Sequence, residues 1–332
     1  MQTIKTTSVN FLDKWQPLGF IGSGSTCDVL LVQDIKTQQK QVIKLYKSDL
    51  KASVAEAEAK MLLSLNHSRI LSASGYFPSV VLPQSEDQYP VGGEPKGLPA
   101  IVLEWVPNGD LLGLIQSFGS LTETTARAYF IQLIDALGYL HEKSICHLDI
   151  KPDNILVDEN YSMKLADLGV AMGVPKDCLV KGKVGTAPYH SPEMHLNLPY
   201  NAYQADLFAL GITLFTMVSG NMPFSSAKAT DQLYSLIIEE NFEEFWAFHE
   251  KLKGSAFSQT FKNLIESMLC FDVKKRLSVQ QIKKHAWVVG IVPTEECLIK
   301  LVTSALNKTT CAEEVKNVQK SCMDEELLSA TC

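Results

Sequence analysis

The stretch His147-Leu-Asp-Ile-Lys-Pro-Asp-Asn-Ile-Leu156, followed by Asp167-Leu-Gly169, decides how the rest of this chain is interpreted. Asp149 can accept a hydrogen bond from a hydroxyl group, and Lys151 can neutralise a phosphoryl group. Asn154 and Asp167 offer the oxygen ligands that a hard cation such as Mg²⁺ prefers. Phosphoryl transfer from ATP needs these groups, because its catalysis is mostly positioning and charge stabilisation. The stretch therefore predicts that chemistry.

The composition is that of an ordinary globular protein of 332 residues, with 46% hydrophobic and 20% charged residues. A net charge of −7 argues against a nucleic-acid binder, which usually has a basic face. The N-terminus has no apolar leader, and the apolar run 207–218 is too short to span a bilayer, so we expect a buried helix there. The eight cysteines form no CxxC pairs and are expected to be free thiols. We predict an intracellular protein, cytoplasmic or nuclear, with no membrane contact.

The order of the predicted elements indicates an α+β fold with two lobes. A polar arm, 1–14, precedes strands within 18–45 and a helix at 51–65; a loop at 83–99 and a strand at 101–106 complete a lobe of 15–106. Helices then fill a lobe of 107–290, one starting at the N-cap Thr122 and others at Ala202–Ser219, 231–240, 257–269 and 279–285.

The segment 291–332 is predicted to be an acidic tail, with four lysines against seven acids. It is expected to form one or two helices, such as Glu295–Leu306. An autoinhibitory segment, a docking helix for a regulatory partner and a disordered tail remain alternatives.

The segment Ile21-Gly-Ser-Gly-Ser-Thr-Cys-Asp-Val29 lies between two predicted strands. Glycine allows backbone amides to approach phosphate oxygens closely, so Gly22, Ser23 and Gly24 could bind phosphate. An ordinary glycine-rich hairpin is the alternative.

Lys44 lies in the next predicted strand, on the same face as Val42. Taken alone it could be a surface lysine, so its role depends on an acidic partner in the helix that follows. Glu58 shares a helical face with Val54, Met61, Leu62 and Leu65, whereas Glu56 points elsewhere. An inward carboxylate is costly unless it is paired. We therefore predict a Lys44–Glu58 pair; the alternative is a partly exposed glutamate.

Together these segments resemble the eukaryotic protein kinase family. The similarity spans about 18–289 and rests on successive motifs: the glycine-rich segment, Val42-Ile-Lys44, Glu58, His147-Leu-Asp149, Asn154, Asp167-Leu-Gly169, Ser191-Pro-Glu193, Asp206, Gly211 and Arg276. Lys151 and Gly185-Thr186 are similar to the Ser/Thr branch. Phe242-Glu-Glu-Phe-Trp246 and Lys283-Lys-His-Ala-Trp287 look most like the calcium/calmodulin-dependent group.

The resemblance implies a bilobal fold, protein substrates, and ATP and Mg²⁺ as cofactors. Lys44 would hold the α- and β-phosphates, oriented by Glu58, and Asp149 would be the catalytic base. The nucleotide would contact Ile21, Gly22, Ser23, Gly24, Val29, Val42, Glu104, Val106, Asp110 and Leu156. Leu103 would guard the pocket, and Asn154 and Asp167 would be the metal ligands. The resemblance also implies a buried Glu193–Arg276 ion pair. Asp206 would brace the catalytic loop, or else cap its own helix.

The chain departs from the family pattern at Leu148, where many kinases have an arginine that binds a phosphorylated activation loop. The loop from Gly169 to Gly185 contains no Ser, Thr or Tyr. Receptor and acceptor are missing together, so we predict activity without activation-loop phosphorylation; drift in a degraded kinase is the alternative. A pseudokinase scaffold and a small-molecule kinase are competing hypotheses, disfavoured by the full set of catalytic residues and by the segment from Gly185 to Glu193 respectively.

Overall fold

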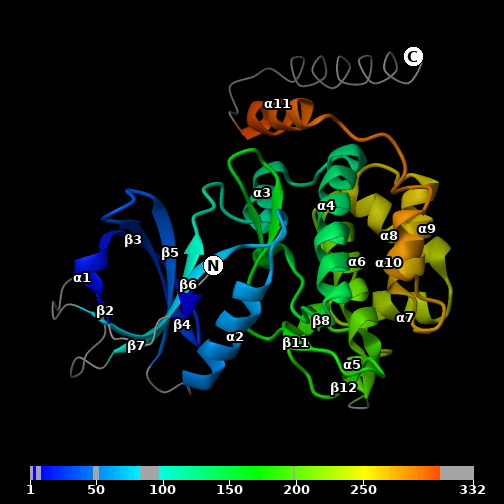
Figure 1. Cartoon of the computed structure of the whole chain (residues 1–332). Coiled ribbons are helices and arrows are strands. Elements are labelled where there is room, and N and C mark those ends of the chain that lie inside the picture. The colour runs from blue at the N-terminus through cyan, green and yellow to red at the C-terminus, as the bar shows by residue number, and fades with distance from the viewer. Residues whose placement is uncertain (1–2, 5–8, 48–51, 83–96, 197–198, 307–332) are drawn as a thin grey trace. The chain divides into compact units, whose positions relative to one another are not determined.

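The computed structural model describes residues 3–4, 9–47, 52–82, 97–196 and 199–306 (Figure 1). The chain divides into two compact units, Met1–Val106 and Pro107–Cys332. The first contains most of the strands and the second most of the helices, which confirms the α+β class. The boundary between Val106 and Pro107 lies where the sequence predicts the change from strands to helices.

The described part of the first unit contains a seven-stranded sheet with the order β1-β6-β7-β5-β4-β3, in which β2 also pairs with β6. Its elements are β1 (Thr3–Ile4), β2 (Val9–Asn10), α1 (Phe11–Lys14), β3 (Trp15–Ser23), β4 (Cys27–Asp34), β5 (Lys40–Tyr46), α2 (Ala52–Ser64), β6 (Ala73–Val81) and β7 (Leu98–Glu104). β1 and β2 each pair with β6 in parallel. All other neighbouring strands of this sheet are antiparallel.

The expectation of a loose arm over residues 1–14 is wrong for residues 9–14. Phe11 and Trp15 are fully buried, and the Trp15 ring meets Phe77 edge-on at 5.1 Å between centroids. Both aromatic residues belong to the core beneath β4, β5 and β7. The strand predicted at 101–106 is also shifted, because β7 starts at Leu98 and ends before Val106. Most of the predicted loop 83–99 lies outside the described residues.

The second unit is built around α4 (Glu123–Glu142) and α6 (Ala202–Ser219), which pack against each other. Thr122 caps α4, as predicted, since its side chain accepts a hydrogen bond from the backbone N–H of Thr125. Its other helices are α3 (Leu111–Phe118), η1 (Pro152–Asn154), η2 (Ala187–Tyr189), α5 (Pro192–His195), α7 (Gln232–Ile238), α8 (Phe242–Lys253), α9 (Gln259–Leu269), α10 (Val279–Lys283) and α11 (Glu295–Leu306). Its short strands form the pairs β8 (Ile145–Cys146) with β11 (Met172–Gly173), β9 (Ile155–Val157) with β10 (Met163–Leu165), and β12 (Leu179–Val180) with β13 (Tyr200–Asn201).

Within the described residues, α6 alone is long and apolar enough to cross a membrane, and 89% of it is buried inside the structure. This agrees with the buried helix expected from the sequence.

The predicted helix Glu295–Leu306 is confirmed as α11, and it packs against α3 through Cys297, Leu298 and Val302, which are buried. Arg127 binds the chain just before it, because its guanidinium donates hydrogen bonds to the carbonyls of Trp287 (2.5 Å) and Ile291 (2.6 Å). The packed unit therefore continues past the predicted boundary at 290, through Leu306. Residues 307–332 of the predicted tail lie outside the described residues.

The cysteines fit the expectation of free thiols in part. Cys27, Cys146, Cys178 and Cys270 are free. Cys297, by contrast, is disulfide-bonded.

Candidate active site

In the first unit, β5 and α2 bring together the predicted Lys44–Glu58 pair. The Lys44 ammonium lies 2.7 Å from Glu58 Oε1, and Glu58 is only 6% exposed. Glu56 instead pairs with Lys60 on the exposed face of α2. The prediction that Glu58 rather than Glu56 pairs with Lys44 is confirmed. The buried face predicted for this helix is partly wrong, since Val54 is 42% exposed.

The buried face of α2 is formed by Ala55, Glu58, Ala59 and Leu62. Two of these residues are alanines. The large apolar residues of the helix therefore predicted a buried face that differs slightly from the observed one. Sequence reasoning also missed Tyr46, whose hydroxyl donates a hydrogen bond to Glu58 Oε2. Its position, two residues after Lys44 in the same strand, was the signal that could have identified it.

The glycine-rich segment connects β3 to β4 through a tight turn in which the Gly24 N–H donates to the Cys27 carbonyl at 2.8 Å. A Cβ on Gly22 would meet nothing within 4 Å, so the segment has an open surface that a phosphate can approach. Cys27, at the position of the usual third glycine, is buried and leaves that surface clear. Ile21, Ser23 and Gly24 are exposed.

The residues predicted to contact adenine in this unit lie on neighbouring strands. Val29 is opposite Lys44, and Val42 is opposite Leu103. Glu104 closes β7, where its backbone N–H donates to the Ser72 carbonyl at 3.0 Å and its carboxylate accepts the Ser72 N–H at 2.7 Å. Val106 follows the strand and is buried.

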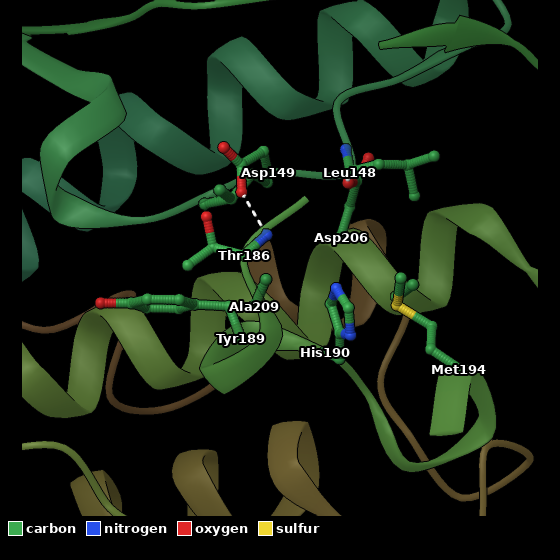
Figure 2. Close-up of a pocket in the computed structure, with 10 residues that line it drawn as sticks. Leu148, Asp149, Thr186, Tyr189, His190, Met194, Asp206 and Ala209 are labelled. Atoms are coloured by element: carbon green, nitrogen blue, oxygen red, sulfur yellow. Dashed lines mark hydrogen bonds between the residues drawn. The ribbon is translucent and has the colours of Figure 1, made fainter. Parts of the chain in front are cut away.

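In the second unit, the catalytic-loop residues predicted from the sequence converge on one carboxylate. Asp149 Oδ1 accepts a hydrogen bond from the Thr186 N–H at 2.7 Å, and Oδ2 accepts one from the Asn154 amide at 2.8 Å. Figure 2 shows the first of these bonds, with Asp149 and Thr186 turned toward each other. Lys151 lies 3.1 Å from Asp149 Oδ2 and donates to Thr186 Oγ1 at 2.6 Å.

This network keeps Asp149 ionised. Burial alone would raise the pKa of Asp149, but the bonds from Thr186, Lys151 and Asn154 outweigh it and hold the pKa below its ordinary value. An ionised carboxylate fixed by three groups is suited to orienting a hydroxyl near a phosphoryl group.

Asp206 braces the backbone of the catalytic loop from α6. Its two oxygens accept the N–H groups of His147 (2.9 Å) and Leu148 (2.7 Å), and it is 1% exposed. Leu148 has φ of 61°, an unfavourable backbone conformation for an apolar residue with a Cβ. The alternative of a helix cap is wrong, because the N-cap of α6 is Asn201.

Asn154 and Asp167 fit the role of magnesium ligands. The Asn154 amide nitrogen is bonded to the carbonyl and carboxylate of Asp149, so its amide oxygen is the atom that remains for a metal. Asp167 is exposed and has φ of 57°, next to Leu168, which is buried and anchors the turn. Two such oxygen ligands suit Mg²⁺, which is usually held by one or two carboxylates together with substrate phosphates. The described residues contain no cluster of three or more His, Cys, Asp or Glu side chains for a metal.

Two further predicted residues are at the start of the second unit. Asp110, expected to contact ribose, caps α3 by accepting the Gly113 N–H at 2.8 Å. It also pairs through its backbone with Leu156 on β9, which brings these two predicted nucleotide contacts together.

The predicted Glu193–Arg276 ion pair is present in the second unit. The guanidinium donates two bonds to the carboxylate, at 2.7 and 3.1 Å, and also bonds the carbonyls of Gln204 and Cys270. Arg276 is 4% exposed, so the arginine side of the ion pair is buried. Its bonds to Glu193 and Gln204 connect α5 to the start of α6.

An apolar cluster surrounds Leu148, which sequence reasoning treated only as a missing arginine. Leu148 is 6% exposed, and Val180 and Val184 of the activation segment (169–185) pack in the same cluster. Its other members are Cys146, Met172, Val174, Met194, Tyr200, Ala202, Tyr203 and Ala205. The small pocket of Figure 2 lies beside it and is lined by Leu148, Asp149, Ile150, Thr186, Tyr189, His190, Met194, Ala205, Asp206 and Ala209. The apolar residues of the activation segment, among them Val174, Val180 and Val184, were the available signal.

Gly185 closes the activation segment against the catalytic loop. It has φ of 81°, and a Cβ there would lie 2.1 Å from the Leu148 carbonyl oxygen. We expect Gly185→Ala to push Thr186 away from Asp149 and to lower kcat by about a hundredfold, since small misplacements in an active site have effects of this size. Steady-state kinetics on a peptide substrate will measure it.

Gly173→Ala is the matched control, because a Cβ at this second glycine of the same segment would meet nothing within 4 Å. It should keep the parental kcat. A Gly185→Ala protein as active as the parent would contradict the close contact with Leu148.

Comparison with known proteins identifies the family. The protein kinase domain model matches residues 15–288. The serine/threonine-protein kinase PKH2 of Saccharomyces cerevisiae is 34% identical over 282 residues, covering 80% of this chain and 24% of the yeast protein. The ovarian-specific serine/threonine-protein kinase Lok of Drosophila melanogaster is 31% identical (81% and 55% covered), and the carbon catabolite-derepressing protein kinase of Secale cereale is 29% identical (82% and 51% covered).

The chain thus spans about a quarter of the length of the yeast kinases PKH1 and PKH2, and about half of the other two relatives named above. The match to the kinase domain model includes all of the predicted catalytic and metal-binding residues, from Lys44 to Asp167. The chain therefore belongs to the protein kinase family, and its relatives PKH2 and Lok are serine/threonine-protein kinases.

Proposed function

We propose that this chain transfers the γ-phosphoryl group of ATP to serine or threonine hydroxyls of protein substrates. The observation that carries the proposal is the network on Asp149, whose oxygens are fixed by Thr186, Asn154 and Lys151. A catalytically dead scaffold has no need for an ionised, fully oriented carboxylate at this place.

Each residue of the site has a role in this proposal. Asp149 accepts a hydrogen bond from the acceptor hydroxyl and orients it for attack. Lys151, held between Asp149 and Thr186, neutralises the phosphoryl group as it moves. Lys44, fixed by Glu58, binds the α- and β-phosphates. Asn154 and Asp167 hold Mg²⁺, which when bound would neutralise charge on the phosphates.

The nucleotide itself is proposed to contact the remaining predicted residues. Backbone amides of the exposed glycine-rich segment would cover the phosphates, and the backbone of Glu104 and of Val106 would bond to adenine. The apolar contacts would come from Ile21, Val29, Val42 and Leu156.

A peptide array with radiolabelled ATP and Mg²⁺ tests the proposal, with Lys44→Met as the inactive comparison. We expect phosphate on serine and threonine but not on tyrosine, and loss of the signal when EDTA removes the metal. An array on which the parent labels no more than Lys44→Met would overturn the proposed activity.

The remaining expectations from the sequence are also proposals. We assign the chain to the calcium/calmodulin-dependent-like group on its two tryptophan motifs; Trp246 and Trp287 both pack against Phe261, at 6.2 and 5.6 Å between ring centroids. We also propose an intracellular location without nucleic-acid or membrane contact, and a regulatory partner for the segment from 291 onward.

We further propose that activity does not depend on phosphorylation of the activation segment. The segment 169–185 has no hydroxyl side chain. It is held instead by the apolar cluster around Leu148, by the pairing of β12 with β13, and by a bond from the Tyr200 hydroxyl to the Gly182 carbonyl at 3.1 Å.

Phosphatase treatment is therefore expected to leave most of the activity intact, with mass spectrometry confirming that phosphate has been removed. Loss of most activity after treatment would contradict the proposal.

Leu148→Arg provides a second test. Without a phosphate to bind, the guanidinium would enter an apolar cluster unpaired, so we expect lower thermal stability and lower activity rather than a gain.

A further inference from the structure

Tyr46 is a second partner of the carboxylate that orients the phosphate-binding lysine. Its hydroxyl donates a hydrogen bond to Glu58 Oε2, while Lys44 occupies Oε1 at 2.7 Å. Tyr46 is 2% exposed and Glu58 is 6% exposed, so the contact is shielded from water. The Lys44 ammonium also lies 5.7 Å from the centroid of the Tyr46 ring, within the range of a cation–π contact.

The strand geometry explains how both residues reach one carboxylate. Successive side chains of a strand alternate between its faces, so Lys44 and Tyr46 of β5 share a face, about 7 Å apart along the strand. Ile43 and Leu45 point the other way, into the core with Trp15. Glu58 on α2 contacts both residues of the first face, and each of its oxygens meets a different donor.

We propose that Tyr46 is a positioning residue that holds Glu58 in the orientation that binds Lys44. This inference deepens the proposed kinase function and rests on it. With Lys44 alone, Glu58 would have a buried oxygen without this donor, and an incompletely bonded buried carboxylate is driven toward water. The tyrosine hydroxyl satisfies that oxygen inside the fold, so the Lys44–Glu58 pair forms without the help of an activating partner.

The test is Tyr46→Phe, which removes only the hydroxyl. We expect kcat to fall about tenfold and the KM for ATP to rise, because the loss of one bond to a charged group has roughly this effect. Tyr46→His, which retains a ring N–H donor, should preserve more of the activity than Tyr46→Phe. Parental kcat and KM in Tyr46→Phe, or lower activity in the histidine variant than in the phenylalanine variant, would overturn the proposal.

Tyr129→Phe is the matched control. Tyr129 is fully buried in α4, and its hydroxyl has no hydrogen-bond partner among the described residues. Loss of that hydroxyl should leave kcat and KM unchanged. An equal loss in both variants would mean that the effect of Tyr46→Phe is a general one of removing a buried hydroxyl, and this too would overturn the proposal.

A thermal double-mutant cycle tests the contact without any activity assay. Tyr46→Phe, Glu58→Gln and the double variant are compared with the parent by melting temperature. We expect the melting temperature of the double variant to fall by clearly less than the sum of the two decreases seen in the single variants. Strictly additive decreases would show that the two side chains are not coupled. If the parent phosphorylates no peptide, the proposed function fails, and the cycle together with Mg-ATP affinity still decides the role of Tyr46.

Discussion

Asp149→Asn is expected to lower kcat for peptide phosphorylation by about 10²–10⁴-fold, the usual contribution of a positioned acid–base group. Asparagine keeps an oxygen that can accept the Thr186 N–H, so the loop should stay in place. It cannot accept a proton, and it loses the charge that holds Lys151 at 3.1 Å. Affinity for Mg-ATP should change little. Single-turnover transfer and calorimetric ATP binding will separate the two quantities.

Glu159→Gln is the matched control for the charge change. Glu159 is exposed and follows the same loop, and it has no ion pair among the described residues. The parental kcat is expected. If Asp149→Asn transfers phosphate as well as the parent does, Asp149 is not the base and the proposed mechanism is wrong.

Asp206→Ala is expected to reduce both stability and activity. It leaves the N–H groups of His147 and Leu148 buried without their acceptor, at about 1–3 kcal/mol each. Leu148 also loses support for its left-handed backbone, which lies directly before Asp149. We expect a lower melting temperature, and a kcat that stays reduced at temperatures where the variant is fully folded.

Asp231→Ala separates the two effects. Asp231 caps α7 and accepts four backbone N–H groups, from Ser225, Ser226, Leu233 and Tyr234, none of which belongs to the catalytic loop. This variant should also melt earlier, but the folded protein should keep its kcat. An Asp206→Ala protein with parental melting temperature and kcat would show that the brace is dispensable.

The sequence predicted the candidate site well where function itself fixes the spacing of the residues. Asp149, Lys151 and Asn154 lie within one short loop, so their convergence follows from their order in the chain. The Lys44–Glu58 pair could be predicted because strand alternation and helical periodicity each select one face. These periods are local, and a single sequence contains them.

The parts that were missed depend on contacts between distant segments. Phe11 reads as part of a polar arm, and only the β-sheet reveals that it is buried beside Trp15. The sequence alone presents Leu148 as a lost arginine, and only the structure places it in an apolar cluster with Val180, more than thirty residues further along the chain. The inner face of α2 uses alanines, which carry little hydrophobic signal. Phe11 and Leu148 lie in segments too short to show a periodic pattern, so their burial becomes visible only in the folded structure.

The apolar cluster around Leu148 also determines how this region responds to solvent. An arginine–phosphate pair weakens as salt is added, because mobile ions screen charges, with a screening length of about 10 Å at 0.1 M salt. Contacts between Leu148, Val180 and Met194 carry no charge, and they are strengthened by salts that are excluded from protein surfaces. Apolar contacts weaken on cooling. The packing of the activation segment is therefore expected to tolerate changes in ionic strength. Cooling, by contrast, is expected to weaken it.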